Sequence, residues 1–182
     1  MSEQILDRRT AYAGRLIDLE VARVRLGNGH ETEREVVHHP GAVAIVALER
    51  EGAGWQALLV RQFRLPAAQA LVELPAGTAE AGEDPQATAR RELAEEVGRQ
   101  ARAWHELARF YPSPGYSDEQ ITVFLALDLE AAEGQPEADE ALEVVSVPLP
   151  QALEAIRKGA IRDGKSIIGL MLAREWLDRQ PE

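Results

Sequence analysis

Three glutamates within five residues are the part of this sequence best suited to chemistry. Glu92, Glu95 and Glu96 are three and four residues apart, so on an α-helix they share one face within about 100°. Like charges at i, i+4 and anions near a helix C-terminus each cost up to about 1 kcal/mol. Arg91 can pair with Glu95, which leaves Glu92 and Glu96 uncompensated. The cluster is either a solvated acidic face or a site for a divalent cation, which prefers carboxylate oxygens; the spacing favours the cation.

The helix that carries these glutamates has clear ends. Asp84 is a good N-cap, Pro85 suits the first helical position, and Gly98 stands where a C-terminal glycine belongs. We therefore predict a helix from about Pro85 to Val97. An apolar stripe beside the acidic face should anchor it to a sheet; it consists of Ala89, Leu93 and Val97.

The stretch from Gly77 to Gly98 resembles the Nudix box. That pattern reads Gly, five residues, Glu, seven residues, Arg-Glu, an aliphatic, any residue, Glu-Glu, any residue, Gly and an aliphatic. Only the last position departs from it, because Arg99 stands where an aliphatic side chain would pack. Every fixed position matches, namely Gly77, Glu83, Arg91, Glu92, Glu95, Glu96 and Gly98.

The resemblance implies an α+β fold, a mixed β-sheet sandwiched between α-helices. It also implies Mg²⁺- or Mn²⁺-dependent hydrolysis of a nucleoside diphosphate linked to another group. Such cations can neutralise phosphate oxygens, position a water and stabilise the leaving phosphate. The implied roles are metal ligation by Glu92 and Glu96 with help from Glu83 and Glu95, orientation of the glutamates by Arg91, and a tight loop turn at Gly77.

Segments outside the box resemble the ADP-ribose pyrophosphatase branch of this family. The strand before the box reads Glu73-Leu74-Pro75-Ala76-Gly77, which implies a metal-binding backbone carbonyl at Ala76 and places Glu73 beside the substrate. Arg61-Gln62-Phe63-Arg64 resembles a segment whose last arginine contacts substrate. The loop from Tyr111 to Glu119 resembles one that contacts the ribose and phosphate side, through Ser113, Pro114 and Glu119.

The general base is less narrowly defined. In this branch it often comes from an acidic loop well after the box, and here that loop holds Glu137, Asp139, Glu140 and Glu143. The segment Asp139-Glu140-Ala-Leu-Glu143 matches the family pattern best with Glu140 as the base. Glu137 and Glu143 remain alternatives, and any one of these acids can also be simply solvated.

The rest of the chain predicts a small N-terminal β subdomain, residues 1–39, followed by a hydrolase domain, residues 40–182. Apolar and polar residues alternate over 10–38, and Gly27-Asn28-Gly29 predicts a hairpin turn there. In the family such a hairpin often exchanges between the subunits of a homodimer. Further strands are predicted at 42–48, 57–64, 71–74, 121–129 and 142–147, further helices at 151–158 and 166–178, and a loop at 130–139.

The charge and composition of the chain limit the classes of partner that it can bind. The formal charge is −11, so the chain lacks the basic excess that nucleic-acid binding requires. No apolar run approaches the roughly 20 residues needed to cross a bilayer. The charged start, Met1 to Thr10, has no secretory pattern, and there is no cysteine. We expect a cytoplasmic protein that binds neither membrane nor nucleic acid.

The leading hypothesis is hydrolysis of ADP-ribose to AMP and ribose 5-phosphate. One alternative keeps the chemistry and changes the substrate to another nucleoside diphosphate sugar or an oxidised nucleotide. A second is a non-catalytic nucleotide-binding module on the same fold, although such proteins usually lose box glutamates. The last is an acidic globular protein with a chance pattern.

Overall fold

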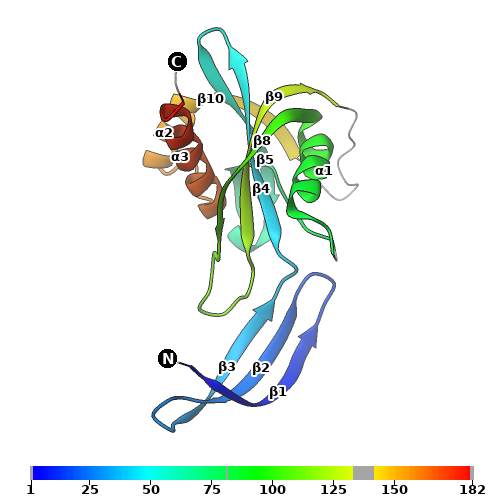
Figure 1. Ribbon diagram of the computed structural model, residues 1–182, viewed down its shortest axis with the longest axis vertical. Helices are drawn as coiled ribbons and strands as arrows, with labels where there is room; N and C mark the ends of the chain where they lie inside the picture. Colours follow the sequence, from blue (N-terminus) through cyan, green and yellow to red (C-terminus); the bar gives the residue numbers. More distant parts are fainter. Residues whose placement is uncertain (1, 81, 133–141, 181–182) are drawn as a thin grey trace. The chain divides into compact units, whose positions relative to one another are not determined.

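The computed structural model describes residues 2–80, 82–132 and 142–180. The chain divides into two compact units, each described by itself below (Figure 1). The first unit comprises residues 1–41 together with residues 110–120, and the second comprises residues 42–109 and 121–182. Grouping the 110–120 loop with the N-terminal strands was not expected from the sequence. The expected division of the chain at residue 39 stays a prediction.

The first unit is a three-stranded antiparallel sheet in the order β1-β2-β3. Its strands are β1 (Gln4–Ala13), β2 (Asp18–Arg25) and β3 (Glu31–His38). The turn between β2 and β3 lies at Gly27-Asn28-Gly29, as predicted, and the Asn28 side chain accepts a hydrogen bond from the His30 N–H. The 110–120 loop joins β3, since the Val37 N–H donates to the Tyr116 carbonyl at 2.7 Å.

The second unit is built on a mixed sheet whose main path runs β10-β5-β4-β9-β8, with β6 paired to β5 and β7 paired to β4. The pair β4–β9 is parallel, whereas β5 lies antiparallel to β4, β6 and β10. The strands are β4 (Ala42–Glu51), β5 (Gly54–Arg64), β6 (Gln69–Glu73), β7 (Ala76–Thr78), β8 (Arg99–Phe110), β9 (Ile121–Ala131) and β10 (Leu142–Pro148). A short 3₁₀ turn, η1 (Leu65–Ala67), joins β5 to β6.

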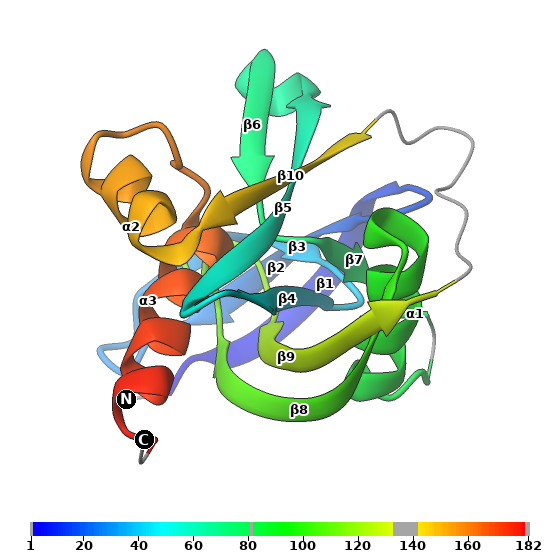
Figure 2. The same ribbon diagram turned by 90° about the horizontal axis from the view of Figure 1, so that it is seen from above.

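Helices cover both faces of this sheet (Figures 1 and 2): α1 (Pro85–Val97) lies on one face, and α2 (Leu149–Arg157) and α3 (Gly164–Asp178) lie on the other. Strand β4 is apolar on both sides because it is buried between these layers. Val43 and Ile45 join the core under α1. This is the mixed sheet between helices that the resemblance implied.

The helix α1 matches its prediction in both limits. Asp84 accepts hydrogen bonds from the N–H groups of Gln86 and Ala87, and Gly98 ends the helix in the left-handed conformation at φ 66°. The predicted apolar stripe is buried, with Ala89 and Leu93 at 0 % exposure. The chemistry-bearing helix is thus fixed by its own caps and by the sheet beneath it.

Two long strands were not predicted. Strand β1 is charged and almost entirely exposed, so it carries no buried alternation that would mark a strand. Strand β8 is rich in alanine and arginine, which favour helix, but it hydrogen-bonds to β9 at the edge of the sheet. The predicted loop at 130–139 begins too early, because β9 continues through Ala131. Among the described residues, no helix has both the length and the apolar character to span a bilayer.

Candidate active site

The carboxylates of α1 are held inside the protein rather than in solvent. Glu92 is 7 % exposed and Glu96 is 2 % exposed, although both are charged residues on a helix. Burial of an ionised carboxylate is costly unless it is paired or hydrogen-bonded. The hypothesis of a solvated acidic face is therefore wrong for these two residues, while Glu95 is half-buried.

Both buried carboxylates lie against the backbone of β7. The Ala76 N–H donates a hydrogen bond of 2.9 Å to Glu96 Oε2. A Cβ atom placed on Gly77 would lie only 1.9 Å from the carboxyl carbon of Glu92, so only glycine permits this approach. Two adjacent residues of one strand therefore meet two carboxylates that are four residues apart on one helix.

Arg91 connects the remaining box acids. Its Nη1 lies 2.7 Å from Glu92 Oε1 and 2.9 Å from Glu95 Oε2, and its Nη2 lies 3.4 Å from Glu83 Oε2. The predicted pairing with Glu95 is confirmed. The expectation that Glu92 and Glu96 lack compensation is wrong, because Arg91 pairs with Glu92 and the Ala76 N–H reaches Glu96.

This pairing shifts the acid–base properties of the loop and the helix. Burial lowers the pKa of Arg91, but hydrogen bonds and charges from Glu83, Glu92 and Glu95 outweigh it and raise that pKa above its ordinary value. The hydrogen bond from Arg91 is the main reason that the pKa of Glu83 lies below its usual range, with a further contribution from the backbone at Glu80. Both groups are accordingly charged at neutral pH.

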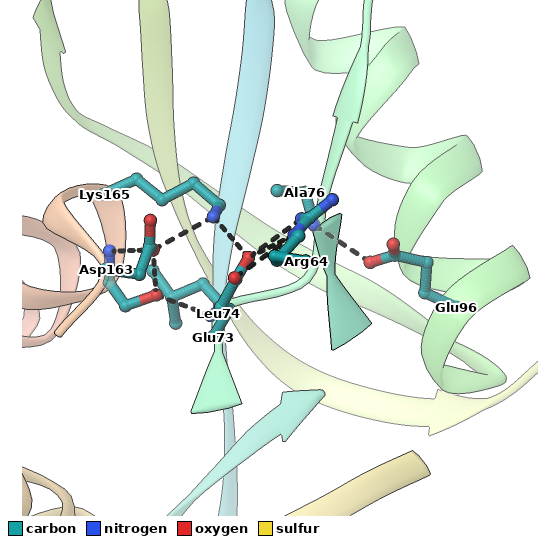
Figure 3. A network of polar contacts seen from close by, with 8 residues as sticks. Arg64, Glu73, Leu74, Ala76, Glu96, Asp163 and Lys165 are labelled. Atoms are coloured by element: carbon teal, nitrogen blue, oxygen red, sulfur yellow. Dashed lines mark hydrogen bonds and ion pairs between the residues drawn. The ribbon is translucent and has the colours of Figure 1, made fainter. Parts of the chain in front are cut away.

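A second charged network surrounds Glu73, the last residue of β6 (Figure 3). Arg64 donates from Nη2 to Glu73 Oε2 at 2.8 Å, and Lys165 Nζ lies 2.7 Å from the same oxygen. Burial raises the pKa of Glu73, but the hydrogen bonds and charges of Arg64 and Lys165 outweigh burial and lower it overall. The net pKa of Arg64 is raised, since its interaction with Glu73 exceeds the effect of its own burial. Glu73 thus orients the guanidinium of Arg64, while substrate binding by Arg64 and Glu73 stays a prediction.

With this geometry in place, residues 38–168 match the profile of the NUDIX domain. The chain belongs to the Nudix family. The ADP-ribose pyrophosphatase of Bacillus subtilis is 41% identical over 91% of this chain and 89% of the relative. The methanol dehydrogenase activator of Bacillus methanolicus is 37% identical over 92% of this chain and 90% of the relative. The ADP-ribose pyrophosphatase of Mycobacterium tuberculosis is 37% identical over 97% of this chain and 92% of the relative.

A solved structure, described as a crystal structure of an ADP compounds hydrolase, has the same fold. It superposes with a TM-score of 0.86 at 24% identity, over 98% of this chain and 95% of that one. The α+β architecture, including the antiparallel N-terminal sheet, is thereby confirmed.

The Nudix box residues fit a divalent cation. The two buried carboxylates supply oxygen ligands of the kind that Mg²⁺ and Mn²⁺ prefer, and the Ala76 N–H hydrogen bond orients one of them, that of Glu96. Within the described part of the chain, no three histidine or acidic side chains already converge as a metal cluster. A set of two carboxylates and the Ala76 carbonyl does not need a third side chain. Ligation by Ala76, Glu83, Glu92 and Glu96 stays a prediction, and Glu83 is held by Arg91.

The one departure from the Nudix box is accommodated by an ion pair. Arg99 stands at the start of β8, where the pattern calls for an aliphatic side chain, and its Nε lies 2.6 Å from Glu49 Oε1 on β4. The arginine thus links two strands across the end of α1. The departure changes local packing and leaves the carboxylates untouched.

The remaining predicted site residues belong to the 110–120 loop, to residues outside the described ranges, or to β10. Ser113, Pro114 and Glu119 belong to the 110–120 loop of the first unit, so their approach to substrate stays a prediction. The favoured base, Glu140, and its alternative Glu137 lie outside the described residues. Glu143, the other alternative, is the second residue of β10, and its Oε2 lies 3.4 Å from Arg61 Nη1.

Sequence reasoning missed Lys165, together with Asp163 and Ser166 beside it. A signal was present, because a helix disfavours a cation in its first turn and Lys165 is the second residue of α3. The same argument from charge and helix polarity had identified the glutamates of α1.

Proposed function

We propose that this Nudix protein hydrolyses the pyrophosphate bond of ADP-ribose, giving AMP and ribose 5-phosphate, with Mg²⁺ or Mn²⁺ as cofactor. The observation that carries the proposal is the pair of buried carboxylates, Glu92 and Glu96, packed against the backbone of Ala76 and Gly77. Two relatives similar to this chain over most of their length are ADP-ribose pyrophosphatases.

Glu92, Glu96 and the carbonyl of Ala76 would hold the cation. A divalent cation at this place neutralises phosphate oxygens, lowers the pKa of a bound water and stabilises the leaving phosphate. Arg91 keeps Glu92 in place through its 2.7 Å contact, and Gly77 leaves room for the carboxylate. These residues determine where a phosphate can bind, and the hydrolytic water adds across one P–O bond of the pyrophosphate.

Arg64 would bind the phosphate chain of the substrate. Its guanidinium is oriented by three hydrogen bonds to Glu73, two from Nε and one from Nη2, and an oriented guanidinium suits phosphate oxygens. By the family resemblance, Ser113, Pro114 and Glu119 would contact the ribose side of the substrate.

Glu140 would take the proton of the attacking water, with Glu95 as a helper on the helix. Replacement of each loop acid by glutamine identifies the base, since loss of a general base typically costs about 10²–10⁴-fold in rate. We expect Glu140→Gln to show the largest loss in kcat. A larger loss in Glu137→Gln or Glu143→Gln would transfer the role to that residue.

The substrate assignment is tested by a panel of ADP-ribose, GDP-mannose and an oxidised nucleoside triphosphate, each with Mg²⁺. We expect the highest kcat/KM for ADP-ribose, with AMP as a product. Negligible turnover of ADP-ribose beside another compound would assign the enzyme to that substrate instead. No turnover of any compound would support a non-catalytic nucleotide-binding module.

We also propose that the enzyme is a cytoplasmic homodimer. Strand β1 is an edge of its sheet, and exposed apolar side chains of the first unit, Ile5, Tyr12 and Leu16, would gain from a partner. Sedimentation at micromolar concentration tests the dimer, and a monomer there would contradict it. Cell fractionation tests the location.

A further inference from the structure

The first turn of α3 holds the strand segment that leads to Ala76 (Figure 3). Lys165 Nζ lies 2.7 Å from Glu73 Oε2. Ser166 Oγ accepts a hydrogen bond of 2.8 Å from the Leu74 N–H and donates to Asp163 Oδ2. Two consecutive residues of the helix therefore bind two consecutive residues at the end of β6. Lys165 forms an ion pair with Glu73, and Ser166 accepts from the backbone N–H of Leu74.

Lys165 is an unfavourable choice for stability alone. It lies in the first turn of α3, at the positive end of the helix dipole. Its side chain is only 13 % exposed, so its ammonium loses much of its hydration. Glu73 and Asp163, at 2.7 and 3.0 Å, provide the compensating negative charge. A neutral residue would avoid the loss of hydration but would remove a cation from Glu73 and Asp163, so the charge of Lys165 sets the charge balance of this network.

The use lies in the charge balance around Arg64. Without Lys165, the only cation in this group would be Arg64, and Glu73 would neutralise it. The carboxylate of Asp163 would then give the three side chains a net charge of about −1. With Lys165 the four side chains sum to zero, and Glu73 is shared between two cations. The guanidinium of Arg64 is the more exposed of the two cations, so it is the one that a ligand can reach.

We propose that Lys165 is a positioning residue for phosphate binding: by pairing with Glu73, it leaves the positive charge of the oriented Arg64 available to the phosphate chain of the substrate. This inference rests on the proposed function, in which Arg64 binds that chain. Lys165 itself acts through Glu73 and Arg64. Ser166 supports the arrangement by fixing the backbone at Leu74.

The test compares steady-state kinetics of the wild type with four variants. Lys165→Met removes the charge and the donor, Lys165→Gln keeps a donor for Glu73 without the charge, and Lys165→Arg keeps both. Lys158→Met removes the same charge from an exposed lysine at the end of α2 and serves as the matched control. Thermal unfolding of each variant establishes that it is folded.

We expect Lys165→Met and Lys165→Gln to raise the KM for ADP-ribose about tenfold while kcat changes less than about threefold, the pattern for loss of binding shared by ground and transition states. Lys165→Arg and Lys158→Met should keep the wild-type KM within about threefold. A structural role alone would instead lower kcat with the fraction of folded enzyme. If Lys165→Met does not fold, Lys165→Gln decides by the same criterion.

An unchanged KM in a folded Lys165→Gln variant, or a KM for Lys165→Arg as high as that for Lys165→Gln, would overturn the inference. Failure of the proposed function looks different, because the wild type itself would then not hydrolyse ADP-ribose. An active wild type is therefore established before the variants are compared.

Discussion

Glu96 of α1 and Ala76 of β7 are joined by one hydrogen bond, in which the Ala76 N–H donates to Glu96 Oε2 at 2.9 Å. The bond fixes the peptide of Ala76 relative to the helix. The carbonyl expected to bind the cation and one of the expected carboxylate ligands thus belong to one rigid arrangement. Changes at either residue should affect catalysis more than folding.

Replacement of Glu96 by glutamine tests this arrangement. Glutamine keeps the size and one carbonyl oxygen, which can still accept from the Ala76 N–H, so we expect the melting temperature to change little. Loss of the negative ligand should lower kcat by about three orders of magnitude, equivalent to the several kcal/mol that a metal site contributes. Glu154→Gln on α2, an exposed position, is the control and should retain activity. A wild-type rate in Glu96→Gln would remove that residue from the mechanism.

A methyl group at Gly77 should lower both activity and stability. The added Cβ would lie 1.9 Å from the carboxyl carbon of Glu92, so the carboxylate must move. We expect Gly77→Ala to lower kcat by at least about a hundredfold and the free energy of unfolding by about 1–3 kcal/mol. Gly54→Ala, whose Cβ would meet its nearest neighbour at 3.7 Å, should change neither quantity appreciably. Full activity in Gly77→Ala would show that Glu92 is not needed where it lies.

Loss of Arg91 should make stability depend on the cation. Arg91→Met removes the guanidinium that contacts Glu83, Glu92 and Glu95, and loss of this charged contact at the largely buried Glu92 should cost about 1–3 kcal/mol. We expect urea unfolding in EDTA to show this loss, and Mg²⁺ to restore more stability to the variant than to the wild type. Equal stabilisation of both proteins by Mg²⁺ would argue against a cation beside these carboxylates.

The first unit should loosen as the pH rises. His38 Nδ1 lies 2.5 Å from Asp118 Oδ2, and this hydrogen bond raises the pKa of His38 above 6.5 despite partial burial. The charged histidine is favoured by folding, so its contribution is complete below pH 6.5 and is lost as the pH rises through the raised folded-state pKa. Both side chains are well exposed, so screening keeps the effect small.

Hydrogen exchange of the Val37 N–H, which donates to Tyr116, reports this change. Between about pH 6 and about pH 9, the observed exchange rate of this N–H should rise by more than intrinsic base catalysis explains, so its protection factor should fall. Asp118→Asn should abolish the additional pH dependence. The same excess in wild type and Asp118→Asn would assign it to another group.

The sequence predicts best where the determinants are local. Asp84, Pro85 and Gly98 define the ends of α1 without reference to the rest of the chain, and both limits agree with the structure. The box spacing likewise placed Glu92 and Glu96 on one face. Local reasoning could not predict how deeply these two side chains are buried, because their burial depends on β7, β4 and the sheet beneath them.

Long-range pairing was the main source of error. Strand β8 has helix-favouring residues and becomes a strand because β9 lies beside it. Lys165 and Glu73 are 92 residues apart in the chain, so their contact could not be read from spacing. Compensation of Glu92 by its neighbour Arg91 was missed for a different reason, because adjacent helical residues do not usually face each other. Here both side chains reach β7, where Arg91 donates to the Thr78 carbonyl and Glu92 lies beside Gly77.

A crystal structure of the enzyme with Mg²⁺ and a non-hydrolysable analogue of ADP-ribose tests the central claim most directly. We predict a cation bound by the Ala76 carbonyl, Glu92 and Glu96, in contact with the phosphate chain of the analogue. A bound analogue with no ion near Glu92 and Glu96, or an ion held elsewhere in the chain, would contradict the mechanism proposed for this site.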